Sequence, residues 1–418
     1  MGLDLQTAFG AQRRASWPVP RYGLPVTDIN AQLPINKKTT SLKRDWLRVL
    51  PPMWLFRLLT KFGVTPPPIK ALMDASSFMV PQWMYAVTKL GIPELLEDGR
   101  KTTDELAAEL AINPDRLGRL LYALEQRGYF KRASIDAANP LHGPWVNTIL
   151  SATLLADHPN TVRPLLLHWV EDCYRPNDRL LQALQDNGCA FSIEQGPSRP
   201  GFFSDFLPQH PDKAQLFSEA MTASSAFTDA AVLRDVNWGR FATVVDAGGS
   251  NGSFLDMALQ KHPRMEGVLF DLPNVIEQAQ ERWAKRSDDV ASRIRFHAGN
   301  FFEQGSIPRL GPADAFVLRN VLHDWPDQQC VEILSNLKAS MQPSSKLMLV
   351  ELGLATEGPT HMLEQARSGI DMLMMTMFEG KERTRPELTD ILNESGFSIV
   401  RVAETRSIAQ VIEARPSD

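Results

Sequence analysis

The segment that organises this 418-residue chain is VVDAGGSNGSFLDMAL, residues 244–259. A β-branched apolar run reaches Asp246, a turn containing Gly248, Gly249 and Gly252 follows, and a helical apolar pattern comes next. Glycine carries no Cβ, so the backbone of such a turn can approach a ligand closely. The amides at the start of the next helix then point at an anionic or polar group. This segment therefore predicts a strand, a ligand-binding turn and a helix.

Further apolar runs follow this turn at intervals that leave room for helices. They are GVLF, RIRFHA, DAFVLR and KLMLVE, with FSIVRV and AQVIEA near the end of the chain. Strands that alternate with helices favour an α/β fold with a doubly wound parallel sheet. Only a short connection separates the last two runs, so we expect the final strand to be antiparallel. Ligands of such sheets bind at the carboxyl ends of the strands.

The chain is expected to have three parts, residues 1–75, 76–200 and 201–418. The first is a basic, Pro-rich extension with eleven Lys and Arg, four Asp and Glu, and nine prolines. Its residues 42–63, LKRDWLRVLPPMWLFRLLTKFG, form an apolar helical pattern broken by two prolines. Such a surface needs a cover, either its own domain, a second subunit or a membrane surface.

The second part begins with a compact helical pattern. Thr102 and Glu105 have the spacing of a capping box, and Asn113 precedes a proline at the start of another helix. Two short helices followed by YFKR resemble a winged helix, which raises DNA binding as an alternative. The net charge of −5 becomes more negative once the basic extension is set aside, so we expect no nucleic-acid partner.

Composition excludes several further classes. Apolar residues make up 43% and charged residues 22%, which is ordinary for a globular protein and unlike a disordered one. No apolar run is long enough for an integral membrane helix, and no secretory leader is expected. Cys173, Cys189 and Cys330 lack CxxC spacing, which indicates neither a disulfide framework nor a thiolate zinc site. We expect a cytoplasmic protein.

The glycine turn favours one nucleotide over another. Ser250 and Ser253 stand where a dinucleotide fingerprint needs glycine, so NAD fits poorly. The turn is closer to the D-x-G-x-G-x-G pattern that holds the amino-acid end of S-adenosylmethionine, with Ser250 in place of the middle glycine. Asp271 and Leu272 follow the second strand, 25 residues after Asp246 in the case of the aspartate. A carboxylate there can accept hydrogen bonds from two ribose hydroxyls.

A candidate for proton transfer follows the fourth strand. His323 lies in RNVLHDWPDQQC beside Asp324, Glu351 ends the next strand, and Glu382 lies in the EGKERT loop. Carboxylates around an imidazole fix its tautomer and stabilise its charged form. We expect His323 to be a general base. The eight histidines show no HxxxH spacing, so no metal site is expected.

These motifs together resemble the caffeic-acid-type (class I) small-molecule O-methyltransferases, many of which act in secondary metabolism. The order and spacing of VVDAGGSNG, FDLPNVI, GNFF, ADAFVLRNVLHDWPDQQC, LVE and EGKERT match, and the match covers residues 76–415 approximately. The resemblance implies a Rossmann-like methyltransferase domain with a mostly parallel seven-stranded sheet behind a helical, winged-helix-like dimerisation domain. It also implies a homodimer, S-adenosyl-L-methionine as cofactor, and an aromatic or polyketide-like substrate.

The resemblance assigns roles by position. His323 would be the proton acceptor, with Glu351 and Glu382 flanking it and Asp324 as the neighbouring acid. The expected cofactor residues come from the ends of four strands and are Asp246, Gly248, Gly249, Gly252, Asp271, Leu272, Asn300, Phe301 and Arg319. Asn300 replaces a usual aspartate and Arg319 stands where the family often has lysine. These departures and Ser250 affect cofactor affinity more than chemistry.

The acceptor substrate is less well specified. Met374 and Met377 precede EGKERT, and Phe217 and Met221 lie on a helical pattern before the catalytic domain. Methionine adapts to flat ligands, although such residues also serve as core packing. We expect methyl transfer to a phenolic or enolic hydroxyl. The open alternatives are a pericyclic or decarboxylative enzyme on the same fold, and a DNA-binding regulator that uses residues 76–132.

Overall fold

The computed structural model describes residues 65–135, 139–354 and 362–417. The chain divides into two units, Met1–Ser76 and Ser77–Asp418. In the first unit the described part holds helix α3 (Pro67–Ser76), and the predicted helical stretch at 42–63 lies outside the described residues. The second unit holds everything else below. The boundaries predicted at residues 75 and 200 stay predictions.

The second unit begins with short helices around a small antiparallel sheet in the order β1-β3-β2. These elements are α4 (Met79–Lys89), α5 (Ile92–Leu95), β1 (Lys101–Thr102), α6 (Thr103–Leu110), α7 (Pro114–Glu125), β2 (Phe130–Arg132) and β3 (Pro144–Asn147). The predicted capping box is present, since Thr102 accepts from the N–H of Glu105 and the Glu105 carboxylate accepts from that of Thr102. Asn113 caps α7 through the N–H of Arg116. Helices and a three-stranded sheet agree with the winged-helix-like expectation.

A run of helices connects this region to the large sheet. It comprises α8 (Ile149–Ala152), α9 (Arg163–His168), the π-helix η2 (Trp169–Cys173), the 3₁₀ helix η3 (Arg175–Arg179), α10 (Leu180–Asp186), α11 (Ala190–Glu194), the π-helix η4 (Phe202–Phe206), α12 (Leu207–Gln209), α13 (Pro211–Asp235) and the 3₁₀ helix η5 (Trp238–Arg240). Helix α13 packs along α9. These two helices carry one side of the cavity described below.

The large sheet has seven strands in the order β6-β5-β4-β7-β8-β10-β9. They are β4 (Thr243–Ala247), β5 (Glu266–Asp271), β6 (Ile294–Ala298), β7 (Ala315–Arg319), β8 (Lys346–Glu351), β9 (Phe397–Glu404) and β10 (Gln410–Pro416). Strands β4 to β8 are parallel, and β10 pairs antiparallel with both β8 and β9. The predicted doubly wound, mostly parallel sheet with an antiparallel final strand is confirmed.

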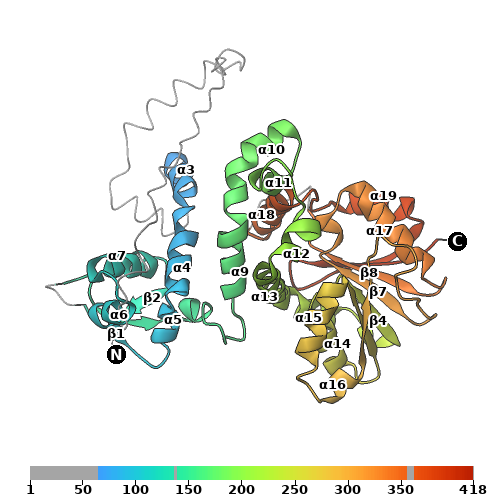
Figure 1. The fold of residues 1–418 in the computed structure, drawn as a ribbon, viewed down its shortest axis with the longest axis horizontal. Coiled ribbons are helices and arrows are strands. Elements are labelled where there is room, and N and C mark those ends of the chain that lie inside the picture. The colour runs from blue at the N-terminus through green and yellow to red at the C-terminus, as the bar shows by residue number, and fades with distance from the viewer. Residues whose placement is uncertain (1–64, 136–138, 355–361, 418) are drawn as a thin grey trace, which may run out of the picture. The chain divides into compact units, whose positions relative to one another are not determined.

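Helices cover both faces of this sheet, as Figure 1 shows for the orange and yellow part of the chain. The remaining elements are α14 (Ser253–Lys261), α15 (Pro273–Trp283), α16 (Asp289–Ser292), the 3₁₀ helix η6 (Leu322–Asp324), α17 (Asp327–Ala339), α18 (Met362–Met377) and α19 (Arg385–Glu394). Val244 packs in a core with α14 and α15, while its neighbour Val245 packs in a second core with α17 and α19. Alternate side chains of a strand point to opposite faces, so each buried strand feeds both cores.

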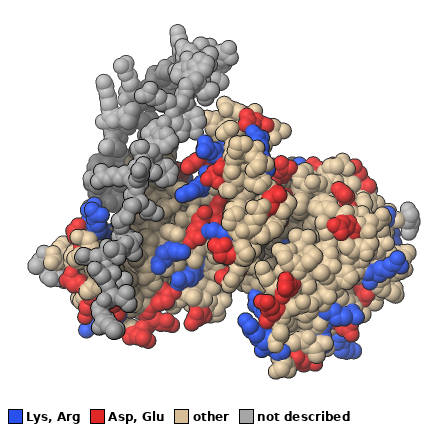
Figure 2. Space-filling model, viewed as in Figure 1, with Lys and Arg blue, Asp and Glu red and all other residues tan. Residues whose placement is uncertain are grey.

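None of the helices in the described ranges is long and apolar enough to cross a membrane. On the face seen in Figure 2, the basic and acidic side chains of the described residues are intermixed. That distribution does not form the continuous basic field that is typical of a nucleic-acid interface on this face.

Candidate active site

A cavity of about 1370 Å³ opens at the carboxyl ends of the parallel strands. The loops after β4, β5, β6 and β7 supply Gly248, Asp271, Asn300 and His323 to its wall, and α9, α13 and α18 close the opposite side. The cavity lies where the strand order reverses between β4 and β7, which is the usual ligand site of such sheets. Residues far apart in the sequence thus meet at one edge of the sheet.

The glycine turn lies directly against the loop that carries His323. Gly248 has φ +76°, and a Cβ there would lie 2.9 Å from a methyl group of Val321. Ser250 holds a left-handed φ of +53°, a strained value for a residue with a side chain. Its N–H donates to Asp271 at 2.8 Å, and its hydroxyl lies 3.2 Å from that of Ser218 on α13. These contacts hold the serine in a conformation that glycine adopts freely.

The Asp271 carboxylate is fixed by the backbone on both sides. One oxygen accepts from the N–H of Ser250 and the other from the N–H of Leu272, each at 2.8 Å. Burial raises the pKa of Asp271 to about 6, and the two N–H donors act in the opposite direction. Each carboxylate oxygen keeps a further lone pair, so two ribose hydroxyls still have acceptors here. Asp271 and Leu272 both line the cavity.

Asn300 and Phe301 also reach the cavity wall. The side-chain oxygen of Asn300 accepts from the N–H of Phe302 at 3.0 Å, which closes a local turn. That oxygen keeps a further lone pair, so both it and the amide nitrogen can contact a ligand. The Phe301 ring meets Trp325 edge-on, with centroids 6.0 Å apart.

Three of the expected cofactor residues do not line the cavity, and they shape the turn from behind. A Cβ on Gly249 would lie 2.6 Å from Cγ of Asp246, so the turn rests on that carboxyl. Asp246 is 1% exposed, and neither of its oxygens has a hydrogen-bond partner among the described residues. Burial raises the pKa of Asp246 to about 7. Gly252, with φ +79°, begins helix α14.

Arg319 lines the cavity, and its guanidinium is bound to protein as well. It pairs with Asp229 on α13 at 3.1 Å, and both side chains are almost completely buried. The guanidinium also lies 5.3 Å from the centre of the Phe254 ring. Burial raises the pKa of Asp229, and the nearby Arg319 opposes this effect. The arginine therefore ties the end of β7 to α13.

His323 stands in a group of carboxylates. Its Nδ1 lies 2.6 Å from Glu382 Oε1, and its Nε2 lies 3.5 Å from Asp324 Oδ1. Glu351 accepts a hydrogen bond from the N–H of Leu322 at 3.2 Å. His323, Glu351 and Glu382 each have one atom that could bind a metal ion, and these three atoms lie within 4.8 Å of one another. The sequence did not show this cluster as a possible metal site, because its members are far apart in the chain.

The charges around His323 determine its protonation. Burial disfavours the imidazolium, but Asp324, Glu382 and Glu351 outweigh that effect and raise the pKa of His323 to about 10. Burial likewise raises the pKa of Asp324 and of Glu351 to about 7. An imidazole in this setting binds a proton strongly, which suits a group that must take one from a weak acid.

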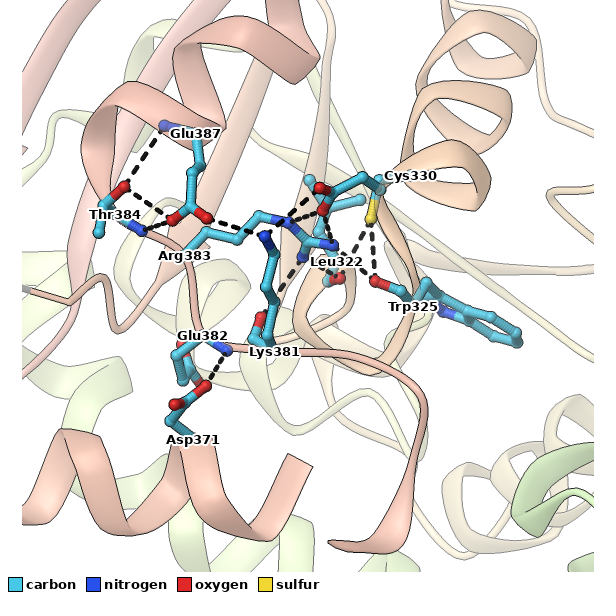
Figure 3. Close-up of polar contacts among 10 residues, drawn as sticks. Leu322, Trp325, Cys330, Asp371, Lys381, Glu382, Arg383, Thr384 and Glu387 are labelled. Atoms are coloured by element: carbon cyan, nitrogen blue, oxygen red, sulfur yellow. Dashed lines mark hydrogen bonds and ion pairs between the residues drawn. The ribbon is translucent and has the colours of Figure 1, made fainter. Parts of the chain in front are cut away.

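The loop that carries Glu382 is clamped to the turn that carries His323 (Figure 3). Arg383, 2% exposed, donates to the carbonyls of Leu322 at 2.7 Å and Trp325 at 2.6 Å and pairs with Asp327 at 2.8 Å. On the other side of the loop, the N–H of Glu382 donates to Asp371 at 2.9 Å. The guanidinium thus holds both ends of the His323 turn.

Gly380 allows the two segments to touch. A Cβ at this position would lie 1.9 Å from the His323 carbonyl oxygen and 2.5 Å from the Asp324 carbonyl carbon. Both are backbone atoms that cannot rotate away. Sequence reasoning missed Gly380 and Arg383 as positioning residues, although both belong to the EGKERT motif that it singled out.

The opposite wall of the cavity is apolar. Phe217, Met221, Met374 and Met377, expected from the sequence, all line it. Phe203 and Phe378 stack with centroids 5.1 Å apart in the same wall, and sequence reasoning missed both. The local signal was the aromatic run that begins at Phe202. This wall offers flat, adaptable surfaces to an acceptor.

The residues at the strand ends fit S-adenosylmethionine. The glycine turn leaves room where a Cβ would collide, Asp271 retains acceptor capacity, and Phe301 is an aromatic residue of the same cavity wall. A volume of about 1370 Å³ exceeds the roughly 300–1,000 Å³ of a single-ligand site. Cofactor and acceptor can therefore occupy one cavity.

Comparison with known proteins agrees with this site. Residues 178–398 match the O-methyltransferase domain family, and residues 73–157 match the O-methyltransferase dimerisation domain family. The chain is 32% identical over 356 residues to the phenazine O-methyltransferase PhzM of Lysobacter antibioticus, covering 85% of this chain and 98% of that protein.

Solved structures agree as well. The crystal structure of LaPhzM superposes with a TM-score of 0.76 at 31% identity, covering 84% of this chain and all of that one. CalO1, a methyltransferase of calicheamicin biosynthesis solved with S-adenosylhomocysteine, gives a TM-score of 0.67 at 25% identity, covering 84% of this chain and all of that one.

Proposed function

This chain belongs to the S-adenosylmethionine-dependent O-methyltransferase family, and we propose that it methylates a phenolic or enolic hydroxyl of an aromatic or polyketide-like metabolite with His323 as general base. The observation that carries the role of His323 is that it lines the same cavity as the glycine turn and lies 2.6 Å from the buried carboxylate of Glu382. The relative PhzM is a phenazine O-methyltransferase, and an aromatic acceptor is the corresponding expectation here.

The glycine-turn side of the cavity would hold the cofactor. Asp271 would accept the ribose hydroxyls, Asn300 and Phe301 would contact the adenine, and Gly248 with Leu272 would border the remainder. Asp246, Gly249, Gly252 and Arg319 would act by keeping the turn and the end of β7 in place. S-adenosylmethionine, when bound, supplies a methyl group activated by the positive charge of its sulfonium.

His323 would remove the proton of the acceptor hydroxyl as that oxygen attacks. A phenol has a pKa of about 10 and an ordinary imidazole about 6.5, so an unassisted histidine would be a weak base for it. The surrounding carboxylates raise the pKa of His323 to about 10, which brings donor and acceptor close to a match. Glu382 would hold Nδ1 and leave Nε2 to face the hydroxyl, and Glu351 and Asp324 would stabilise the imidazolium.

The apolar wall would align the acceptor. Phe217, Met221, Met374 and Met377 would hold a flat ring so that its hydroxyl lies in line for displacement, which is mainly an effect of proximity. Such a wall gives no reason to expect a charged acceptor core.

We also propose a cytoplasmic homodimer without a nucleic-acid partner. The match to the dimerisation domain family supports self-association, and three free, buried cysteines agree with a reducing compartment. On the face that Figure 2 shows, the intermixed basic and acidic side chains give no support to the DNA-binding alternative.

The decisive experiment supplies S-adenosylmethionine with an isotopically labelled methyl group and an extract of aromatic metabolites. Mass spectrometry should find a product that carries the labelled methyl, and His323→Ala should not form it. Loss or isomerisation of a compound without methyl gain would favour the pericyclic or decarboxylative alternative. A labelled product formed equally by His323→Ala would contradict the role of the histidine.

A further inference from the structure

A second histidine that is paired with a carboxylate lines the same cavity. His168, at the end of α9, is 3% exposed, and its Nδ1 lies 2.9 Å from Asp172 Oδ2. Its other ring nitrogen, Nε2, lies 3.4 Å from the sulfur of Cys173. His168 and Cys173 both belong to the cavity wall. No sequence motif pointed to either residue, and the methyl-transfer chemistry uses neither.

The local helix geometry brings these three groups together. Residues Trp169–Cys173 form a π-helix, in which hydrogen bonds join residue i to residue i+5. Both the fourth and the fifth residue after His168 therefore return to its side. A regular α-helix would turn Cys173 away. Single π-turns are costly and are frequent at functional sites, which makes this one a feature to explain.

The carboxylate of Asp172 is held between His168 and a lysine. Its second oxygen pairs with Lys213 of α13 at 2.9 Å, and Lys213 also pairs with Glu171 at 2.8 Å. Hydrogen bonds to these two carboxylates raise the pKa of Lys213 in spite of burial. The Asp172 carboxylate accepts a hydrogen bond from Nδ1–H of the imidazole, so in the neutral ring Nε2 is the acceptor nitrogen.

The surroundings of Nε2 are aromatic. The His168 ring meets Phe217 edge-on at 5.3 Å, and Phe202 lies 6.2 Å away. A polar acceptor in such a wall costs free energy unless it has a partner. The thiol of Cys173 is its partner here, and a thiol is a weak donor. A hydroxyl of a ligand would form a stronger hydrogen bond than the thiol does.

The arrangement is not a thiol nucleophile. Burial and the charge of Asp172 raise the pKa of Cys173 far above its ordinary value. The reactive form of cysteine is the thiolate, so this group stays an inert thiol. A recognition role is what the remaining features favour.

We propose that Nε2 of His168 accepts a hydrogen bond from a second hydroxyl of the acceptor substrate, away from the hydroxyl that faces His323. The substrate class is then a flat aromatic with at least two hydroxyl groups on different parts of its ring system. This inference rests on the proposed function, because it concerns the acceptor of that reaction. His168 would determine specificity and take no part in proton transfer.

The test compares 2-naphthol with 2,7-dihydroxynaphthalene. Calorimetry with S-adenosylhomocysteine present would measure the affinity of the wild-type enzyme, His168→Phe and His168→Gln for each compound. One added hydrogen bond predicts that the wild type binds the diol about tenfold more tightly. His168→Phe should reduce that ratio to about one, and His168→Gln, which keeps an acceptor, should restore part of it.

Other outcomes contradict the proposal. A wild-type enzyme that binds both compounds equally, or neither, overturns it, and so does a preference that survives in His168→Phe. Thermal unfolding of each variant identifies a folding defect. If His168→Phe is defective, the preference measured with His168→Gln alone tests the proposal. Methyl transfer to the diol, measured separately with labelled cofactor, distinguishes the two proposals. A binding preference without any methyl transfer to the diol would contradict the proposed function and leave His168 only as the residue that binds the second hydroxyl of a ligand.

Discussion

Two histidines that line one cavity each pair with a buried carboxylate, and the charges around the two pairs differ. His323 meets Glu382 at 2.6 Å, and His168 meets Asp172 at 2.9 Å. Further carboxylates surround His323, whereas Lys213 neutralises Asp172. The same pair geometry can therefore serve proton transfer in one place and fixed recognition in another. Net charge, and not the pair itself, separates the two roles.

The two pairs also differ in how they are held. His168 and Asp172 lie four residues apart on one helical segment, so local geometry joins them. His323 and Glu382 are 59 residues apart and lie on two loops that Arg383 clamps together. The pair to which we assign proton transfer thus depends on tertiary contacts that a single change can disturb.

The largest effect should come from His323→Ala. Loss of the base should lower the rate of methyl transfer by roughly 10²–10⁴-fold, while S-adenosylhomocysteine binding stays within a few-fold of wild type. Initial rates with labelled cofactor and calorimetry measure the two quantities. In contrast, His168→Phe should act mainly through KM for a dihydroxylated acceptor. A His323→Ala rate within tenfold of wild type would remove the distinction between the pairs.

Gly380→Ala should have the next largest effect. Its Cβ would lie 1.9 Å from the His323 carbonyl oxygen, so the loop must move and the contact with Glu382 must lengthen. We expect about 1–3 kcal/mol less stability and a rate decrease on the order of 10²-fold. Chemical denaturation and initial rates would test this.

Gly369→Ala is the matched control, because nothing lies within 4 Å of a Cβ at that position in α18. It should stabilise the helix by about 0.5–1 kcal/mol and leave the rate near wild type. If both alanine variants behaved alike, the close approach at Gly380 would not matter.

A smaller effect should appear in the pH dependence of Glu382→Gln. Only the neutral imidazole accepts a proton, so the rate should rise with pH as His323 deprotonates, towards about pH 10. Removing one carboxylate lowers the pKa of His323, so the increase of the rate with pH should occur at lower pH. Asp172→Asn should leave the increase of the rate at the same pH, since Asp172 is not among the groups that raise the pKa of His323. Rate profiles from pH 6 to pH 10 would compare the two variants.

The pKa of His323 should also make the free energy of unfolding depend on pH. Folded His323 has a pKa above its ordinary value of 6.5. Its protonation therefore stabilises the fold fully below pH 6.5, and this stabilisation is lost as the pH rises towards about 10. Glu382→Gln should narrow the pH range over which the stabilisation is lost. An unchanged dependence of unfolding free energy on pH would contradict the charge assignment.

The smallest effect should come from a chelator. His323, Glu351 and Glu382 lie close enough to hold a divalent ion, but Nδ1 of His323 already has Glu382 at 2.6 Å. We expect EDTA to change the rate by less than about twofold, and added Zn²⁺ to inhibit by competing with the proton for the imidazole. A large loss with EDTA that Zn²⁺ or Mg²⁺ restores would assign the cluster to a metal.

Local patterns carried much of the prediction. Alternating apolar runs predicted the doubly wound sheet, and the glycines after Asp246 predicted the turn at the cavity. His323 was found because it follows a strand end, where ligands of these sheets bind. The expected carbonyl of Asn300 shows the limit, since its side-chain oxygen instead closes a turn with Phe302.

The amino-acid sequence by itself determined which strands and helices form and which residues stand at the strand ends, because periodicity, capping and turn chemistry act over a few residues. Only the tertiary structure decided that Glu382 meets His323, that Arg383 and Gly380 hold that contact, and that His168 faces the same cavity. Those contacts join residues from separate loops and helices. Their existence depends on packing across the whole sheet, which no local pattern records.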